Sequence, residues 1–198
     1  MRWRGWARGA ALLATSGTSW AALPEPAEEG MPEQTLSIDA ASTTVNFEIV
    51  ALWFLKRRGE FTEIEGTLKI LDDGKRAQID VRIAVASVQM KDPEHVELLL
   101  SPAFFDAVGH PLIEFNSKPF KLSAKTAVAL PGYLTVRGVR RKVRFEIDAS
   151  HCEPEKRCSV IVNGVLSRSK FGMTEYRRTL SDEVHLSIDA SVLIGNGG

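Results

Sequence analysis

Four histidines, at positions 95, 110, 151 and 185, are the first candidates for acid–base catalysis or metal binding in this chain. None of them stands with a serine or cysteine in a pattern typical of nucleophilic catalysis, and no two have the spacing of a metal-binding pair. His185 alternates with Val184 and Leu186, which places it on the solvent side of a strand. The residues therefore predict neither a catalytic centre nor a metal site, and we expect a protein that is not an enzyme.

Two acid pairs, Asp72-Asp73 and Asp182-Glu183, lie where predicted strands end, and a solvated turn explains them better than hydrolytic chemistry. The chain also lacks the glycine-rich loop that holds phosphate groups. The function classes that remain are ligand binding and interaction with a partner.

Cys152 and Cys158 are the only cysteines, and five residues separate them. Redox-active pairs usually have two residues between their cysteines. A metal site that used His151 as well would lack a fourth ligand nearby in the sequence. In an exported protein such a pair predicts a structural disulfide that closes the loop between the two cysteines.

The first 21 residues are organised like a secretory signal peptide. Three arginines form a basic start, residues 9–14 are small and apolar, and Ser19-Trp20-Ala21 offers a small-x-small cleavage site. The alternative is a disordered basic tail. Residues 22–34, which are rich in proline and glutamate, predict a disordered lead-in. We expect a domain over residues 35–198 that is periplasmic or secreted.

Cleavage after Ala21 leaves 22 basic against 25 acidic residues, a mildly acidic balance that argues against nucleic-acid binding. Three basic clusters nevertheless stand out: Lys56-Arg57-Arg58, the arginines and lysine around residues 137–144, and Arg177-Arg178. One interpretation is contact with an anionic lipid headgroup or a membrane surface. The other, which the scattered acids favour, is solubility and protection of strand edges.

Apolar and polar residues alternate over at least five segments, which predicts antiparallel strands with one apolar and one wetted face. Such wetted faces exclude a sheet that helices cover on both sides. Asp72-Asp73-Gly74, Leu130-Pro131-Gly132 and Gly138 predict turns between the strands. Alternation alone predicts six to eight strands and leaves a barrel and a sandwich as alternatives.

One short helix is predicted between these strands. Asp92 can cap it, Pro93 suits its first position, and it should end near Ser101-Pro102. We expect this helix to cover one end of the barrel. An irregular segment over residues 169–179 is expected to cover the mouth.

Three sequence blocks point to a known family. They are the run from Leu100 to Ser117, with its Phe104-Phe105-Asp106 corner, the hairpin Gly132-Tyr133-Leu134-Thr135-Val136-Arg137-Gly138, and the block Arg168-Ser169-Lys170-Phe171-Gly172-Met173. In this order they resemble the YceI-like family of exported proteins, over roughly Leu36 to Val192. Lys170 and Ala51 depart from the family pattern, where an acid and a histidine are common.

The resemblance implies an all-β fold, an eight-stranded antiparallel lipocalin-like barrel, that carries a long apolar molecule without catalysis. From the residues alone a filled core is an alternative to a hollow one. The resemblance favours a hollow barrel whose apolar lining comprises Phe47, Ile49, Phe61, Leu68, Val81, Ile83, Phe104, Phe105, Phe115, Leu134, Phe145, Phe171 and Met173.

For the polar end of the ligand, the candidates are Asn116, Arg168 and Ser169. No cofactor is required, and the ligand expected is an isoprenoid, a quinone-like lipid or a fatty amide. The alternatives are a filled barrel that binds a protein or a membrane surface and, as the least favoured, an enzyme acting on a bound lipid. Transient membrane contact and a homodimer are left open.

Overall fold

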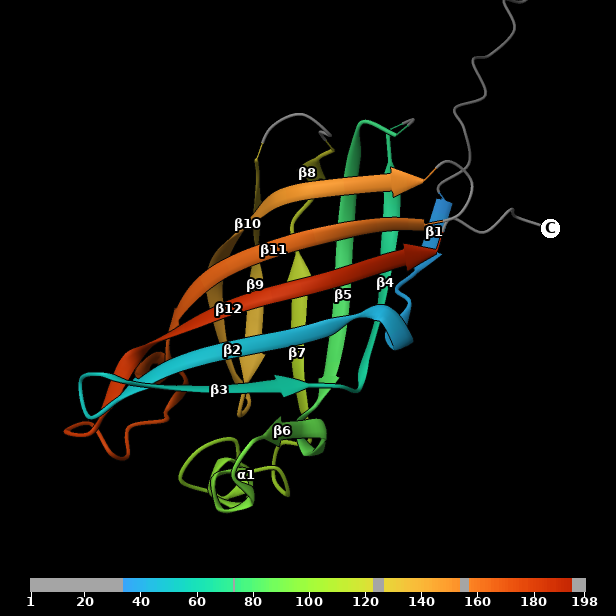
Figure 1. Cartoon of the computed structure of the whole chain (residues 1–198). Helices are drawn as coiled ribbons and strands as arrows, with labels where there is room; N and C mark the ends of the chain where they lie inside the picture. Colours follow the sequence, from blue (N-terminus) through green and yellow to red (C-terminus); the bar gives the residue numbers. More distant parts are fainter. Residues whose placement is uncertain (1–33, 73, 123–126, 154–156, 194–198) are drawn as a thin grey trace, which may run out of the picture.

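The computed structural model describes residues 34–72, 74–122, 127–153 and 157–193. The predicted signal peptide and nearly all of the predicted lead-in therefore lie outside the described residues. Within the described part, the chain forms one antiparallel sheet of twelve strands, one α-helix and three short 3-10 helices (Figure 1). No helix among these residues is long and apolar enough to cross a membrane.

The strands differ widely in length, and the longest follow one another in the second half of the chain. They are β1 (Gln34–Ser37), β2 (Thr44–Ala51), β3 (Leu55–Phe61), β4 (Ile64–Leu71), β5 (Arg76–Ala84), β6 (Val88–Met90), β7 (Leu112–Ser117), β8 (Phe120–Lys121), β9 (Val128–Val136), β10 (Val139–Glu153), β11 (Arg157–Ser167) and β12 (Leu180–Leu193). The 3-10 helices are η1 (Ala40–Ser42), η2 (Val85–Ser87) and η3 (Arg168–Phe171).

The sheet curls strongly upon itself. Its strand order is β1-β4-β5-β7-β9-β10-β11-β12-β2-β3-β6, and β8 pairs with β5 beside this path. Figure 1 shows β11, β12, β2 and β3 crossing obliquely in front of the upright strands β4, β5, β7 and β9. A single bridge between Ile38 and Val192 joins the segment after β1 to the end of β12. The arrangement encloses the apolar face of every long strand.

The all-β class and the barrel-like curl are confirmed, whereas the eight-strand count is not. Within the described residues, β1, β6 and β8 have only two to four residues each. Elements this short carry too few alternating positions to be recognised as strands in the sequence. β10 also bends at a register shift between Ile147 and Ala149, which lets one strand serve both layers.

Leu130, Pro131 and Gly132 lie inside β9, so the turn predicted there is wrong. Pro131 pairs with Arg144 of β10 and lies just beyond the residues of β9 that pair with β7, where its missing N–H costs no ladder bond on that side. Gly132 is required by close packing, because a Cβ there would lie 2.5 Å from the Phe115 ring. The proline and glycine that predicted a turn therefore belong to a closely packed stretch of strand β9.

The helix α1 (Pro93–Leu100) has the predicted bounds and begins after Asp92. The Asp92 side chain makes no capping hydrogen bond, contrary to expectation. Its carboxylate instead lies 3.5 Å from Arg57 Nη1 and 3.3 Å from His95 Nδ1. Figure 1 places α1 across one end of the barrel, next to β6. The helix thus lies at one end of the barrel, as predicted.

Two hairpins turn through residues with positive φ. Between β9 and β10 these are Arg137 (φ 51°) and Gly138 (φ 69°), and between β2 and β3 they are Leu52 (φ 48°) and Trp53 (φ 68°). The β9–β10 connection is a two-residue turn, because Val136 pairs with Val139, whereas three residues separate Ala51 from its partner Leu55 in the β2–β3 connection. In both, two successive residues with positive φ match the type I′ geometry that suits the twist of a hairpin. A left-handed conformation costs a residue with a Cβ about 1–2 kcal/mol, so Leu52 and Trp53 are unfavourable choices for their positions.

Candidate functional site

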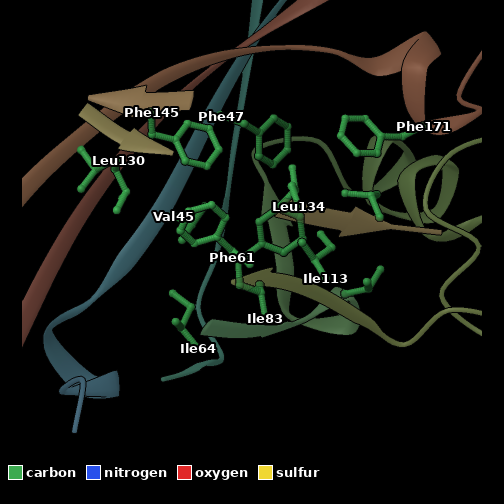
Figure 2. Packing of buried hydrophobic residues seen from close by; sticks show 14 of the residues in the cluster. Val45, Phe47, Phe61, Ile64, Ile83, Ile113, Leu130, Leu134, Phe145 and Phe171 are labelled. Atoms are coloured by element: carbon green, nitrogen blue, oxygen red, sulfur yellow. The ribbon is translucent and has the colours of Figure 1, made fainter. Parts of the chain in front are cut away.

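The barrel encloses one large apolar cavity of about 610 Å³. This volume falls within the range of sites that hold small apolar ligands, about 300–1,000 Å³. All thirteen residues predicted as apolar lining contribute to its wall. Figure 2 shows side chains from several strands, among them Phe47 and Phe145, gathered in this interior together with Phe171 of η3. The cavity favours a hollow barrel over a filled one.

Phenylalanine rings form much of the wall and contact one another. The ring centroids of Phe47 and Phe61 are 5.7 Å apart, and those of Phe61 and Phe105 are 5.6 Å apart. On the opposite layer, Phe115 and Phe145 are 5.2 Å apart. Tilted and edge-on contacts of this kind stabilise aromatic pairs beyond simple burial. The wall is therefore held by ring contacts that do not need to fill the centre of the barrel.

Glycines on neighbouring strands give these rings room to lie flat against the sheet. A Cβ on Gly59 would lie 2.4 Å from the Phe47 ring, and one on Gly164 would lie 2.1 Å from the Phe145 ring. Such a ring covers the backbone of the glycine. The missing side chains thus keep the aromatic wall thin and leave volume inside. The sequence alone does not indicate this role, because a lone glycine in a strand has several explanations.

Arg168 lies at one end of the cavity, where it is almost fully buried, with 3% of its surface exposed. Its Nη1 donates hydrogen bonds to the carbonyl oxygens of Met173 and Glu175, each at 2.7 Å. Nε donates to the Ser181 carbonyl at 2.9 Å, and Nη2 to that of Leu180 at 3.3 Å. Burial lowers the pKa of Arg168. The guanidinium fixes the irregular segment after β11.

A second arginine ties this segment to the loop that follows α1. Arg137 donates through Nη1 to the Gly172 carbonyl at 2.9 Å and through Nη2 to the Pro102 carbonyl at 3.0 Å. Phe104 stacks on Tyr176 across the same boundary, with ring centroids 5.8 Å apart. The two irregular segments thus close this end of the barrel together. The sequence places Arg137 in the family's hairpin block and in a basic cluster, and neither predicts these two contacts.

Asn116 and Ser169 do not form part of the described cavity wall. Strand alternation puts Phe115 inside and hence Asn116 outside, where its amide donates to Asp80 Oδ1 at 3.0 Å. The Ser169 backbone N–H donates to Asp182 Oδ1 at 2.9 Å. Of the three polar candidates, only Arg168 lines the cavity, and most of its donors are already used by carbonyl groups.

The wall includes three basic side chains that were not predicted there, Arg57, His95 and Lys121. Arg57 and His95 lie on β3 and α1 and share Asp92 as their acidic neighbour. The described wall contains no aspartate or glutamate. Arg57 was visible in the sequence only as part of a charged run, and no periodicity linked β3 to the helix.

The histidines are dispersed over the described structure. His110 Nε2 is 3.8 Å from Asp106 Oδ2, His95 neighbours Asp92, and His185 lies exposed on β12. Nothing is described of the His151 side chain. Among the described residues, no group of three or more His, Cys, Asp or Glu side chains could hold a metal ion. Within the described ranges, the three histidines whose side chains are placed lie on separate elements.

The two cysteines face each other across a hairpin. In the ladder between β10 and β11, Cys152 pairs directly with Cys158. Directly opposed strand residues have Cα separations of about 4.5–5.5 Å, within the range a disulfide spans. The register is therefore suited to the predicted bridge, which stays a prediction.

Comparison with known proteins identifies one matching family and solved structures with a similar fold. A family model described as YceI-like domain matches residues 36–192. A search of curated proteins finds no match. Among solved structures, the chain is similar to BcnA of Burkholderia cenocepacia, with 18% identity, a TM-score of 0.69, and coverage of 78% of this chain and 98% of that one.

Two further structures share the fold. A polyisoprenoid binding domain from Saccharophagus degradans, implicated in plant cell wall breakdown, is 13% identical, with a TM-score of 0.62 and coverage of 80% of this chain and 97% of that one. The YCEI protein of Campylobacter jejuni is 23% identical, with a TM-score of 0.60 and coverage of 67% and 82%. At these identities the likeness establishes the fold alone.

Proposed function

The chain belongs to the YceI-like domain family, and we propose that it binds one long apolar molecule inside its barrel and sequesters or ferries it through water. The observation that carries this proposal is the cavity of about 610 Å³, whose wall is built mainly from aliphatic and aromatic side chains. The Saccharophagus degradans domain, which is named for polyisoprenoid binding, has the same fold and supports the same chemistry. Binding buries the apolar ligand in the barrel without any covalent change.

Apolar burial suffices for useful affinity. Each buried methylene contributes about 0.8 kcal/mol, so ten to fifteen of them give a gross gain of roughly 8–12 kcal/mol. The free-energy cost of ordering the ligand and the protein reduces this gross gain, and the net gain still corresponds to micromolar or better affinity. The ligand classes that fit are a polyisoprenoid, a quinone with an apolar tail, and a fatty amide. A carrier of this kind would act outside the cytoplasm, as the predicted signal peptide also suggests.

For the polar end of the ligand we propose Arg57 and His95. Both line the cavity near α1, and among the described residues each has Asp92 as its acidic neighbour. A hydroxyl, carbonyl or amide oxygen could accept a hydrogen bond from either donor. Arg168 is a weaker candidate, because four of its five N–H groups already bond to carbonyl oxygens.

The proposal is tested by measuring uptake of a polyprenol, an isoprenoid quinone and a fatty amide by delipidated protein. We expect saturable binding of at least one class. Phe47→Arg, which places a charge in the wall, should abolish it. Val81→Trp, which fills the cavity with apolar volume, should weaken it without introducing a charge. Val165→Arg, on the exposed face of β11, is the matched control and should bind normally. Equal binding by all four proteins would place the ligand outside the barrel and overturn the proposal.

A further inference from the structure

The turn between β2 and β3 carries three large apolar side chains into solvent. Leu52, Trp53 and Phe54 are 42%, 85% and 75% exposed. Figure 1 shows this turn projecting from the same end of the molecule as the loop that precedes β12. Three consecutive exposed residues of this size differ from the singly scattered apolar residues of ordinary protein surfaces. The tip therefore has an apolar character that folding does not explain.

The backbone of the turn makes this choice of residues more informative. Leu52 and Trp53 occupy the two central positions, both with positive φ, and Phe54 N–H donates to the Ala51 carbonyl at 3.2 Å. Asparagine and glycine are the residues that suit such positions. Trp53 combines this unfavourable conformation with a side chain that is 85% exposed, which points to a role outside the fold.

A basic group surrounds the apolar tip. Arg177 and Arg178 lie next to Thr179, whose carbonyl accepts a hydrogen bond of 2.7 Å from Leu52 N–H. Neither arginine forms an ion pair with any other described residue. The strand β3 adds Lys56 and Arg58, whereas Arg57 between them lines the cavity.

The acids near the tip neutralise only part of this charge. Glu48 pairs with both Lys56, at 2.8 Å, and Arg58, at 2.7 Å. Asp92 pairs with Arg57, and Glu175 is exposed on the loop that carries Arg177 and Arg178. Asp182 and Glu183, near the start of β12, are two further acids of this region. None of these acids forms an ion pair with Arg177 or Arg178, which stay without an ionic partner among the described residues. The exposed apolar turn and its two neighbouring arginines therefore complement a binding partner whose surface is anionic and partly apolar.

The tip is continuous with the cavity wall. Leu52, Leu55 and Thr179 line the cavity and also belong to the turn and the neighbouring loop. A bilayer that received the tip would therefore meet the barrel at a place where its interior wall reaches the surface.

We propose that Leu52–Phe54 together with Arg177 and Arg178 form a docking tip for an anionic lipid bilayer. Trp53 enters the interfacial region, which suits its amphipathic ring, Phe54 adds apolar surface beside it, and the arginines contact the headgroup phosphates. The inference deepens the proposed function, on which it rests for the cargo that is exchanged with the bilayer. A protein partner is the alternative occupant that the test must separate.

The test is flotation of the full chain with vesicles of phosphatidylcholine alone or of equal amounts of phosphatidylcholine and phosphatidylglycerol. We expect binding to the anionic vesicles that falls with added salt. Arg177→Gln with Arg178→Gln should weaken it by about 10- to 30-fold, and Trp53→Ser with Phe54→Ser by about 10-fold or more. Lys142→Gln with Arg144→Gln, and Val165→Ser, remove similar groups elsewhere and should change binding less than about 2-fold.

Fluorescence gives a second readout that other lipid-binding segments cannot supply. The chain has four tryptophans, and subtraction of the Trp53→Phe spectrum isolates the emission of Trp53. Insertion predicts a blue shift of that emission on anionic vesicles. An unchanged Trp53 emission, or equal flotation of tip and control variants, would overturn the docking tip in favour of a protein partner. Uptake of polyprenol by the tip variants is measured in parallel, so a failed docking tip leaves the proposed function standing.

Discussion

Arg168 Nη1 lies 2.7 Å from the carbonyl oxygen of Met173, a residue whose side chain lines the cavity. One end of the apolar interior is thus shaped by a buried guanidinium that acts through backbone groups. The neighbouring carbonyls of Glu175, Leu180 and Ser181 accept from the same side chain. This end of the barrel therefore depends on a buried charged residue whose hydrogen bonds fix the surrounding backbone.

Arg168→Met should destabilise the fold by about 3 kcal/mol, because it leaves several carbonyl groups without their donor. Arg168→Lys should also destabilise it, since an ammonium group cannot reproduce the planar fork. Chemical unfolding measures both variants against Arg144→Met, an exposed arginine on β10. Equal stability of Arg168→Met and Arg144→Met would contradict the role of Arg168.

Asp182 gives this end of the barrel a pH dependence. Burial acts to raise its pKa, but hydrogen bonds from Ser167 Oγ and from the Ser169 backbone and side chain outweigh burial, and the pKa falls below its ordinary value of 3.8. A carboxyl group whose pKa is lower in the folded than in the unfolded protein contributes its full stabilisation at pH values above the unfolded pKa. This stabilisation is lost as the pH falls through the folded pKa.

Asp182→Asn should therefore be less stable than the wild type near neutral pH, and the difference should shrink below about pH 4. Urea unfolding across the acid range measures this difference. Because Glu48 and Asp72 also have lowered pKa values, the wild type alone will lose stability in acid, and only the comparison isolates Asp182. A difference that widens on acidification would refute the assignment.

Gly164→Ala should reduce the capacity of the cavity, because the new Cβ would displace the Phe145 ring toward the interior. We expect weaker uptake of long apolar ligands, with a loss of stability of about 1–3 kcal/mol from overpacking. Combining it with Phe145→Leu should restore part of the uptake by removing the clash. If Gly164→Ala bound ligand as well as the wild type, the ring would not limit the volume.

The cysteine pair predicts a bridge with a measurable effect. In protein recovered from an oxidising compartment, we expect no free thiol after denaturation and a mass increase only after reduction and alkylation. Cys158→Ser should lower stability by about 2 kcal/mol, as expected for so small a ring. Two titratable thiols per chain in such a preparation would contradict the bridge.

Strand alternation predicted the inner wall well, because the direction of a side chain in a strand follows from parity. Phe115 and Leu134, assigned to the interior from sequence, pair with each other across β7 and β9 and line the cavity. The same parity explains why Asn116 lies outside. Local pattern could therefore identify which side chains face inward before any strand order was known.

Contacts between distant segments could not be predicted in this way. Arg137 bonds to carbonyls on two loops about 35 residues away in either direction, a relation that depends on how the barrel closes. Gly132 resembled a turn residue because a close ring and a tight turn both require glycine. The strand count failed for a related reason, since strands of two to four residues have no readable period.

The central claim is that the barrel carries one apolar molecule, and the most direct test is solvent extraction of the purified protein followed by mass spectrometry of the extract. We predict about one equivalent of an isoprenoid, quinone or fatty-amide lipid per chain, and much less from Phe47→Arg that retains its fold. Extraction of no such lipid from the wild type, or of the same amount from both proteins, would contradict the claim.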